Sequence, residues 1–146
     1  MSYVLGFTPM RRHVITISVV VGLVAATCYA MPSLRRGLMA RNCLANMKSM
    51  GYAATVWSTA HSGAAPTNWL SFSTELITPK MMLCPGDPGR TPVAEWAKFG
   101  PENTSYEIIE GGGRCGASNR VFFRCKLHGY VCMGNGLVLR HAPPPQ

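Results

Sequence analysis

The feature that most constrains this chain is a stretch without any charged residue, residues 14–34. Its first part reads VITISVVVGLVAATCYAM, and basic residues flank the stretch at positions 11–13 and 35–36. A helix that crosses a bilayer needs about 20 mostly apolar residues at ~1.5 Å rise per residue. The sequence therefore predicts a basic N-terminal tail over residues 1–13 and a transmembrane helix over residues 14–32.

Two other kinds of segment also begin with basic residues followed by an apolar run. A cleaved signal peptide needs small residues at its cleavage site, and Cys28-Tyr29-Ala30 fits that requirement poorly. A lipoprotein anchor would need a small residue directly before Cys28, where Thr27 stands. Helical periodicity continues beyond Pro32, which favours a helix that is retained in the mature protein.

The basic residues are concentrated beside the predicted span. The net charge is +8, and residues 1–74 hold six Lys or Arg and no acid, whereas residues 75–146 hold eight bases and six acids. Basic residues beside a span usually contact anionic lipid head groups. A nucleic-acid interface would need bases interleaved with exposed aromatics in the globular part, which is nearly neutral. We therefore expect the lipid bilayer, and no nucleic acid, as a partner.

Beyond the span, apolar residues recur at steps of three and four between residues 40 and 57, which predicts an amphipathic helix over residues 33–62. Gly63 is a suitable C-cap, and Pro66 prevents the helix from continuing. We expect the apolar stripe to pack on a sheet. The residues expected to make this helix–sheet contact are Leu44, Met47, Ala54 and Trp57.

Residues 63–146 have the pattern of a small, β-rich, Cys-containing domain with a frayed, Pro-rich C-terminus. A short helical turn is expected at 73–77, and strands are expected at 105–109, 120–125, 130–133 and 137–140. Gly134-Asn135-Gly136 between the last two is the strongest hairpin signal in the chain. One long helix with a small antiparallel sheet is an α+β fold, and the sheet needs the helix to cover its apolar face.

An ordered series of motifs over residues 32–140 resembles a family. Residues 43–51, CLANMKSMG, are similar to the C-x-N-N-L/M-K-Q-I/M-G segment that opens the exposed helix in a large group of bacterial pilin-like proteins. Later segments are similar to that group's later motifs: Ala54, Trp57, Gly63 and Pro66, then LCP at 83–85, TSY at 104–106, RCKLHG at 124–129 and GNGLV at 134–138. The chain thus resembles the type IV pilins and the pseudopilins of type II secretion.

This resemblance implies a non-enzymatic structural subunit of an envelope filament or of a type II secretion-type machine. It implies a single-pass protein of the bacterial inner membrane, with its C-terminal domain facing outward into the periplasm or the cell surface. The expected partners are other pilin-like subunits or further copies of the chain. The residues expected to serve membrane insertion and assembly are Val14, Val19, Gly22, Met31 and Pro32.

The N-terminus departs from the pilin pattern. Pilin precursors usually carry a Gly-Phe-Thr-Leu-x-Glu leader junction that is cut after the Gly. The chain has Gly6, Phe7 and Thr8 but places Arg11 where the Glu belongs. This departure favours a second hypothesis, a monomeric, membrane-tethered binding domain, with or without a zinc staple.

Four cysteines and a histidine form the one constellation with chemical meaning. Cys125-x-x-His128 has a spacing that can clamp a metal, and Cys84 with Cys132 or Cys115 would complete four ligands for zinc. Disulfide bonding of the same four cysteines is the leading alternative, with Cys84–Cys125 as the first pair. The third alternative is that some of them remain buried free thiols.

The remaining cysteines, Cys28 in the span and Cys43 on the helix, are expected to be packing residues. Disulfides would require an oxidising compartment and hence an outward-facing domain. Charge points weakly the other way, because Arg35, Arg36 and Arg41 follow the span and two bases precede it. Sequence alone leaves the topology and the cysteine state open.

Nothing in the sequence indicates catalysis. The six acids form no paired pattern, and no Ser or Cys stands in a nucleophile motif. The glycine-rich segments 111–113 and 134–136 lack the strand–loop–helix setting of a phosphate-binding loop, so we interpret them as turns. We expect no enzyme activity, no small-molecule substrate and no cofactor, with zinc as the only exception that the residues allow.

Overall fold

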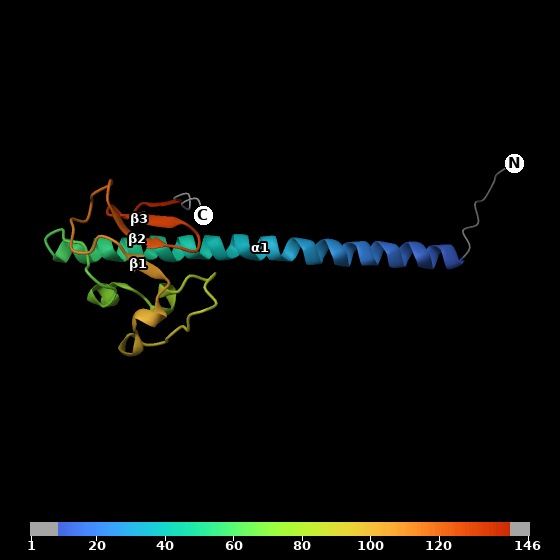
Figure 1. Cartoon of the computed structure of the whole chain (residues 1–146), viewed down its shortest axis with the longest axis horizontal. Coiled ribbons are helices and arrows are strands. Elements are labelled where there is room, and N and C mark those ends of the chain that lie inside the picture. The colour runs from blue at the N-terminus through green and yellow to red at the C-terminus, as the bar shows by residue number, and fades with distance from the viewer. Residues whose placement is uncertain (1–8, 141–146) are drawn as a thin grey trace. The chain divides into compact units, whose positions relative to one another are not determined.

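The computed structural model describes residues 9–140, and the side chains of residues 16–140. Within these residues it has one α-helix, α1 (Pro9–Ala60), followed by four short 3-10 helices and then four strands, and Figure 1 shows the strands beside the C-terminal part of α1. The chain divides into two compact units between Gly37 and Leu38, and α1 contributes to both. Residues 1–8 of the predicted basic tail and the predicted Pro-rich end at 141–146 lie outside the described residues.

The N-terminal part of α1 is an exposed apolar helix. Val19, Gly22 and Met31 are all exposed, and Val14 lies within α1, although its side chain is outside the described part. Within residues 16–140 one helix is long and apolar enough to cross a membrane, and none of its most apolar window is buried. A candidate membrane span thus lies where the sequence predicts one.

Pro32 lies inside α1 and does not end it. A proline within a helix lacks the N–H for the usual backbone hydrogen bond. Side chains next to it bond to the local carbonyls: Ser33 Oγ donates to Ala30 O at 2.8 Å, and Arg36 Nε donates to Pro32 O at 3.3 Å. The predicted membrane helix and the predicted amphipathic helix are therefore one element.

The C-terminal part of α1 buries the predicted stripe. Met47 and Ala54 are buried in the core, whereas Leu44 and Trp57 are half-buried. Steps of three and four residues keep these side chains on one face of the helix. The helix ends at Ala60, and the Gly63 N–H then donates to Ser58 O at 2.9 Å with Gly63 at φ +79°, as expected for a glycine C-cap.

The sheet is a four-stranded antiparallel meander in the order β1-β2-β3-β4. Its strands are β1 (Tyr106–Ile108), β2 (Val121–Cys125), β3 (Tyr130–Met133) and β4 (Val138–Arg140). All four coincide with predicted segments, and the sheet packs on α1, so the α+β prediction is confirmed. In the predicted β3–β4 hairpin the Gly136 N–H donates to Met133 O at 2.9 Å, and Gly136 has φ +81°.

Between α1 and the sheet the chain forms irregular loops with short 3-10 helices. These are η1 (Leu70–Glu75), η2 (Pro79–Met82), η3 (Trp96–Lys98) and η4 (Pro101–Asn103). The helical turn expected at 73–77 is therefore displaced toward the N-terminus. Phe72 from η1 and Met82 from η2 join Met47, Met50 and Phe123 among the largest fully buried side chains. The core thus lies between α1, the 3-10 segments and one face of the sheet.

The helix and the sheet are in close contact at Gly51. A Cβ there would lie 2.8 Å from Cys132 Sγ and 3.2 Å from the Gly136 carbonyl oxygen. We expect Gly51→Ala to lower the stability of the domain, since overpacking typically costs about 1–3 kcal/mol and the gain in helix propensity is only about 1 kcal/mol. Unfolding of the purified chain in detergent, followed by circular dichroism, measures the difference.

Gly37 provides the matched control, because it lies in the same helix and a Cβ there meets nothing within 4 Å. Gly37→Ala should therefore leave the unfolding midpoint unchanged or raise it. A Gly51→Ala midpoint as high as that of Gly37→Ala would show that the helix and the sheet are not in close contact at Gly51.

Candidate metal centre

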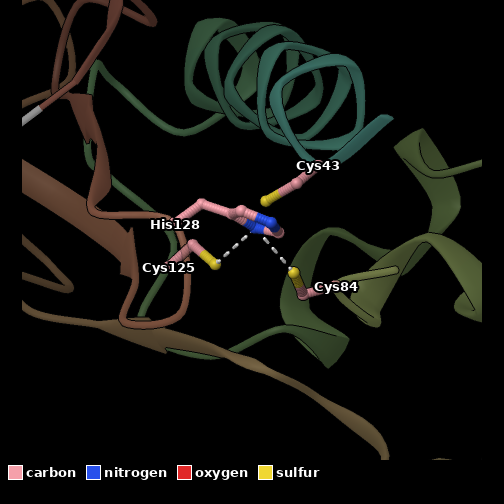
Figure 2. Close-up of side chains that lie close together, drawn as sticks. All are labelled: Cys43, Cys84, Cys125 and His128. Carbon is pink, nitrogen blue, oxygen red and sulfur yellow. Dashed lines mark hydrogen bonds between the residues drawn. The ribbon is translucent and has the colours of Figure 1, made fainter. Parts of the chain in front are cut away.

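Cys43, Cys84, Cys125 and His128 come together at one point of the domain. Each offers one ligand atom, a sulfur or a ring nitrogen, and these four atoms all lie within 4.8 Å of one another. Figure 2 shows the four side chains pointing toward one another from the helix, from a loop and from the sheet. His128 Nδ1 lies 3.1 Å from Cys84 Sγ and 4.0 Å from Cys125 Sγ.

Local structure explains how two of these side chains reach the same point. Cys125 ends β2, and His128 lies in the turn that leads to β3. The Gly129 N–H donates to Cys125 O at 3.0 Å, and Gly129 takes φ +65°, a backbone conformation that favours glycine. The turn therefore folds the imidazole back beside the sulfur three residues earlier.

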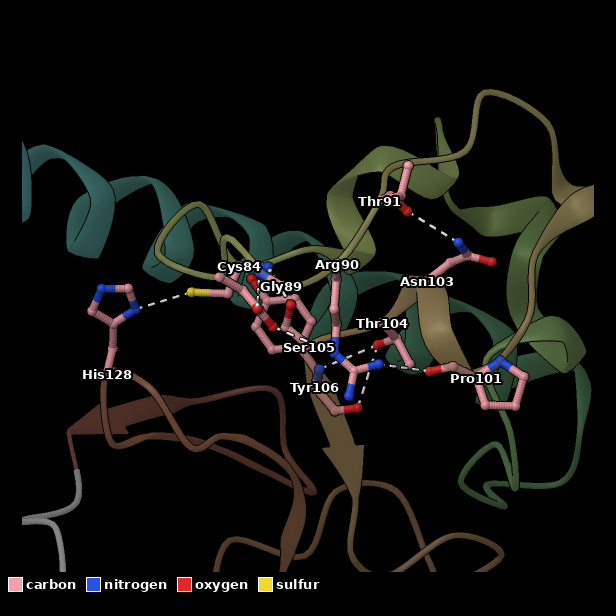
Figure 3. A network of polar contacts seen from close by, with 11 residues as sticks. Cys84, Gly89, Arg90, Thr91, Pro101, Asn103, Thr104, Ser105, Tyr106 and His128 are labelled. Atoms are coloured by element: carbon pink, nitrogen blue, oxygen red, sulfur yellow. Dashed lines mark hydrogen bonds and ion pairs between the residues drawn. The ribbon is translucent and has the colours of Figure 1, made fainter.

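The loop that carries Cys84 is fastened to the start of β1. The Cys84 N–H donates to Ser105 Oγ at 3.0 Å, and the Ser105 N–H donates to Met82 O at 2.9 Å. Figure 3 shows this loop beside the segment around residues 101–106, with Cys84 directed at His128. These two hydrogen bonds hold the backbone at Met82 and Cys84 against Ser105.

Gly86 allows the same loop to approach the imidazole closely. A Cβ at Gly86 would lie 2.9 Å from His128 Cε1 and 3.8 Å from Cys84 Sγ. Any larger residue would push the ring away from the sulfurs. The Cys-Pro-Gly sequence at 84–86 therefore suits a loop that closes over a histidine.

The cluster is largely shielded from water. Cys43, Cys84 and Cys125 are buried in the same core as Met47 and Phe123, and His128 is half-buried. Catalytic zinc sites keep one coordination position open to solvent or substrate, whereas structural sites are closed by four protein ligands. The burial of this cluster is that of a structural site.

One of the three sulfurs has a hydrogen-bond donor from outside the cluster, because the Tyr106 hydroxyl donates to Cys43 Sγ at 3.7 Å. Donors aimed at sulfur stabilise the thiolate form, which is the form that binds metals.

The three thiols also shift one another's pKa values. Hydrogen bonds from Cys43 and Cys84 hold the pKa of Cys125 well below its ordinary value. The hydrogen bond with Cys125 raises the pKa of Cys43, and that same neighbour raises the pKa of Cys84 to about 11. Burial raises the pKa of Tyr106, so its hydroxyl remains a donor.

Three of the residues predicted from sequence as zinc ligands, Cys84, Cys125 and His128, meet in the structure. The fourth predicted ligand is wrong. Cys132 is outside the cluster, since its sulfur faces Gly51 of α1, and burial raises its pKa to about 12, as expected of a packing cysteine.

Cys115, the other residue predicted to complete the set, is also outside the cluster and donates to Ala54 O at 3.8 Å. Cys43 is the fourth member instead, although its sequence position predicted only packing. Its place on the buried stripe of the helix indicates that it faces the core, but that signal does not separate a ligand from a packing cysteine. Three cysteines and a histidine then complete a four-ligand set.

All six cysteines are free thiols in the described structure. The Cys84–Cys125 disulfide predicted from sequence is therefore not formed there, although both sulfurs belong to the cluster. The disulfide remains a competing prediction, which the purification without reductant described below tests.

Apart from the cluster, a concavity of about 270 Å³ lies between the 68–70 segment and the 99–101 segment. Its lining is mostly apolar and contains no titratable side chain. The lining residues are Asn68, Trp69, Leu70, Phe99, Gly100, Pro101 and Thr104. The described residues that line this concavity therefore include no pair of side chains for acid–base catalysis.

Comparisons of the chain with protein-family models, with curated proteins and with solved structures find no match. The likeness to pilins therefore depends on the sequence motifs, and the α+β fold is consistent with it.

Proposed function

We propose that this protein is a non-enzymatic, pilin-like or pseudopilin-like structural subunit of an envelope filament or type II secretion-type machine. One observation carries the proposal: α1 continues without interruption from an exposed apolar segment into the core of a small α+β domain. The same helix can therefore anchor the chain in a bilayer and hold the domain beside it.

The exposure of the apolar segment supports a role in the membrane. Ile17, Val21 and Leu23 each expose more than half of their surface. Exposed apolar surface is unfavourable in water by about 25 cal/mol per Å², so this segment requires lipid or other apolar helices around it. We propose the bilayer of the bacterial inner membrane, and the spans of neighbouring subunits or of further copies, as these surroundings.

The basic residues after the span are consistent with this placement. Arg35, Arg36 and Arg41 are exposed. Exposed arginines next to a span attract anionic head groups, and each such residue near the surface contributes about 1 kcal/mol to the free energy of membrane binding. In the proposed subunit the outward-facing domain begins at Leu38, between Arg36 and Arg41, and its loops provide specificity for partners.

Crosslinking through the span tests assembly. Cys28 is exposed on α1 and is a natural reporter. Val19 precedes it by nine residues, which at about 100° per residue places the two on opposite faces of the helix. In membranes that also contain the other filament subunits, we expect oxidative crosslinking of Val19→Cys to give ladders of covalent oligomers on denaturing gels.

Val24→Cys is the matched control, because residue 24 lies one turn before Cys28 on the same face, so its products should stop near dimers. A Cys28→Ser chain gives the background from the other cysteines. If every one of these variants gives only monomer on the gel, although partner subunits are present, the subunit proposal is contradicted. That result would favour the monomeric, membrane-tethered binding domain, to which the Cys43–Cys84–Cys125–His128 cluster gives specific support as a staple.

A further inference from the structure

The cluster of Cys43, Cys84, Cys125 and His128 has the donor set of a zinc site. Zinc in structural sites is held by four tetrahedral ligands, and three cysteines with one histidine is a common combination. Thiolate sulfur also selects soft or borderline metals over magnesium and calcium. Iron–sulfur clusters are usually held by four cysteines. The chemistry of these four side chains therefore points to zinc.

The spacing of the donor atoms fits a single ion. Zn–S bonds of about 2.3 Å and Zn–N bonds of about 2.0 Å place tetrahedral ligand atoms about 3.6 Å apart. His128 Nδ1 lies at 3.1 and 4.0 Å from the sulfurs of Cys84 and Cys125, on either side of that value. Since all four ligand atoms lie within 4.8 Å of one another, small side-chain movements bring them to the coordination distance.

Hydrogen bonds around the cluster hold two of its residues. Cys43 Sγ accepts from the Tyr106 hydroxyl at 3.7 Å, and the Cys84 backbone N–H donates to Ser105 Oγ at 3.0 Å. Such partners fix the orientation of metal ligands and balance the charge of thiolates. A disulfide would leave one of the three thiols and the imidazole without a role, whereas a metal ion uses all four side chains.

We propose that Cys43, Cys84, Cys125 and His128 bind one Zn²⁺ as a structural site, with His128 coordinating through Nδ1. Three thiols lose their protons to solvent, and the resulting three thiolates and the neutral imidazole give a complex of net charge −1. No bond is oxidised or reduced in this step. The Tyr106 hydroxyl, which donates to Cys43 Sγ, offsets part of the remaining negative charge.

The site would fasten together parts of the chain that are far apart in sequence. Cys43 belongs to α1, Cys84 to the loop after η2, and Cys125 and His128 to the end of β2 and its turn. Since metal affinity adds directly to folding free energy, a zinc ion here stabilises a domain whose four strands are short. This inference holds whether or not the chain assembles into filaments, because its readout is metal content.

The test is metal content of the full chain, purified in detergent under reducing conditions after expression with zinc. Elemental analysis should give about one zinc per chain, as a four-ligand site predicts. Titration of the metal-free chain with Co²⁺ should give the visible bands of tetrahedral cobalt and near-ultraviolet thiolate charge transfer. Cys43→Ser and His128→Ala should lose the zinc, whereas Cys132→Ser, which removes a buried cysteine outside the cluster, should keep it.

If Cys43→Ser and His128→Ala lose zinc because they unfold, the His128→Cys variant keeps the assay informative. This variant offers four sulfurs, so it should retain about one zinc and show stronger thiolate-to-cobalt charge transfer than the natural chain. A natural chain without stoichiometric zinc and without the tetrahedral cobalt spectrum would overturn the proposal. So would a Cys43→Ser chain that keeps its zinc. A Cys28→Ser chain, purified without reductant, in which Cys84 and Cys125 are found joined in a disulfide would also overturn it.

Discussion

Met47→Asp is expected to unfold the domain. Met47 is fully buried on the helix face that packs against the sheet. Truncation of a buried Met to Ala lowers the free energy of unfolding by about 2–5 kcal/mol. Asp also places an unpaired carboxylate in the core, which lowers it further. Because domains are stable by only about 5–15 kcal/mol, the variant should lack a cooperative thermal transition and should be cut rapidly by trypsin within residues 38–140.

Ser49→Asp is the matched control, since Ser49 is exposed on the same helix two residues away. It adds the same charge without burying it, so its unfolding midpoint should remain near that of the natural chain. Met47→Leu keeps the volume and should cost less than about 1.5 kcal/mol. A Met47→Asp chain as stable as Ser49→Asp would show that the stripe does not face the core.

The fold could be predicted because its determinants are local. The uncharged stretch, the stripe on the helix and the Gly134-Asn135-Gly136 turn each act over about twenty residues or fewer, and each favours one kind of local structure. The strands follow from the alternation between turns. The irregular segment from η1 to η4 was harder to predict, because 3-10 turns have poor periodicity and depend on tertiary packing.

The site was predictable only in part. Cys125 and His128 share one turn, so their spacing alone indicated a clamp. From sequence Cys132 was a reasonable ligand. In the β2–β3 register, however, Cys132 pairs with Phe123, whereas Cys125 pairs with Tyr130. Two residues along a strand amount to about 7 Å, which carries the Cys132 sulfur away from the cluster.

Cys43 could not be distinguished in advance from an ordinary core cysteine. It lies 41 residues before Cys84, so no local spacing connects the two. A cysteine on a buried helix face packs as a small hydrophobe in most proteins. Only the tertiary contact between α1 and the loop after η2 shows that its sulfur meets the other two.

The cysteine state and the topology of the chain are now separable questions. From sequence, an outward-facing domain implied a disulfide, and a cytoplasmic domain implied thiols or zinc. A buried Cys3His site weakens this link, because coordination holds the three sulfurs as thiolates and burial limits the access of oxidants. Topology therefore needs a reporter outside the cluster.

Ile77→Cys provides that reporter, and its labelling is expected to be all or none. Ile77 is 94% exposed and lies outside the core. If the domain faces outward, as the proposed subunit requires, a thiol reagent that cannot cross the inner membrane should label Ile77→Cys in intact cells as fully as in lysed cells. Ile77→Ser in a Cys28→Ser chain gives the background, to which the half-buried Cys115 contributes and the buried Cys43, Cys84, Cys125 and Cys132 should add little.

Labelling of Ile77→Cys only after lysis would place the domain in the cytoplasm. The charge pattern would then have predicted the orientation correctly. Three arginines follow the span and two precede it, and the side with more basic residues tends to be cytoplasmic. The filament role would be contradicted, since a subunit of such an assembly must present its domain outside the inner membrane. The zinc site would be unaffected, because its four ligands lie in one folded unit on whichever side that unit occupies.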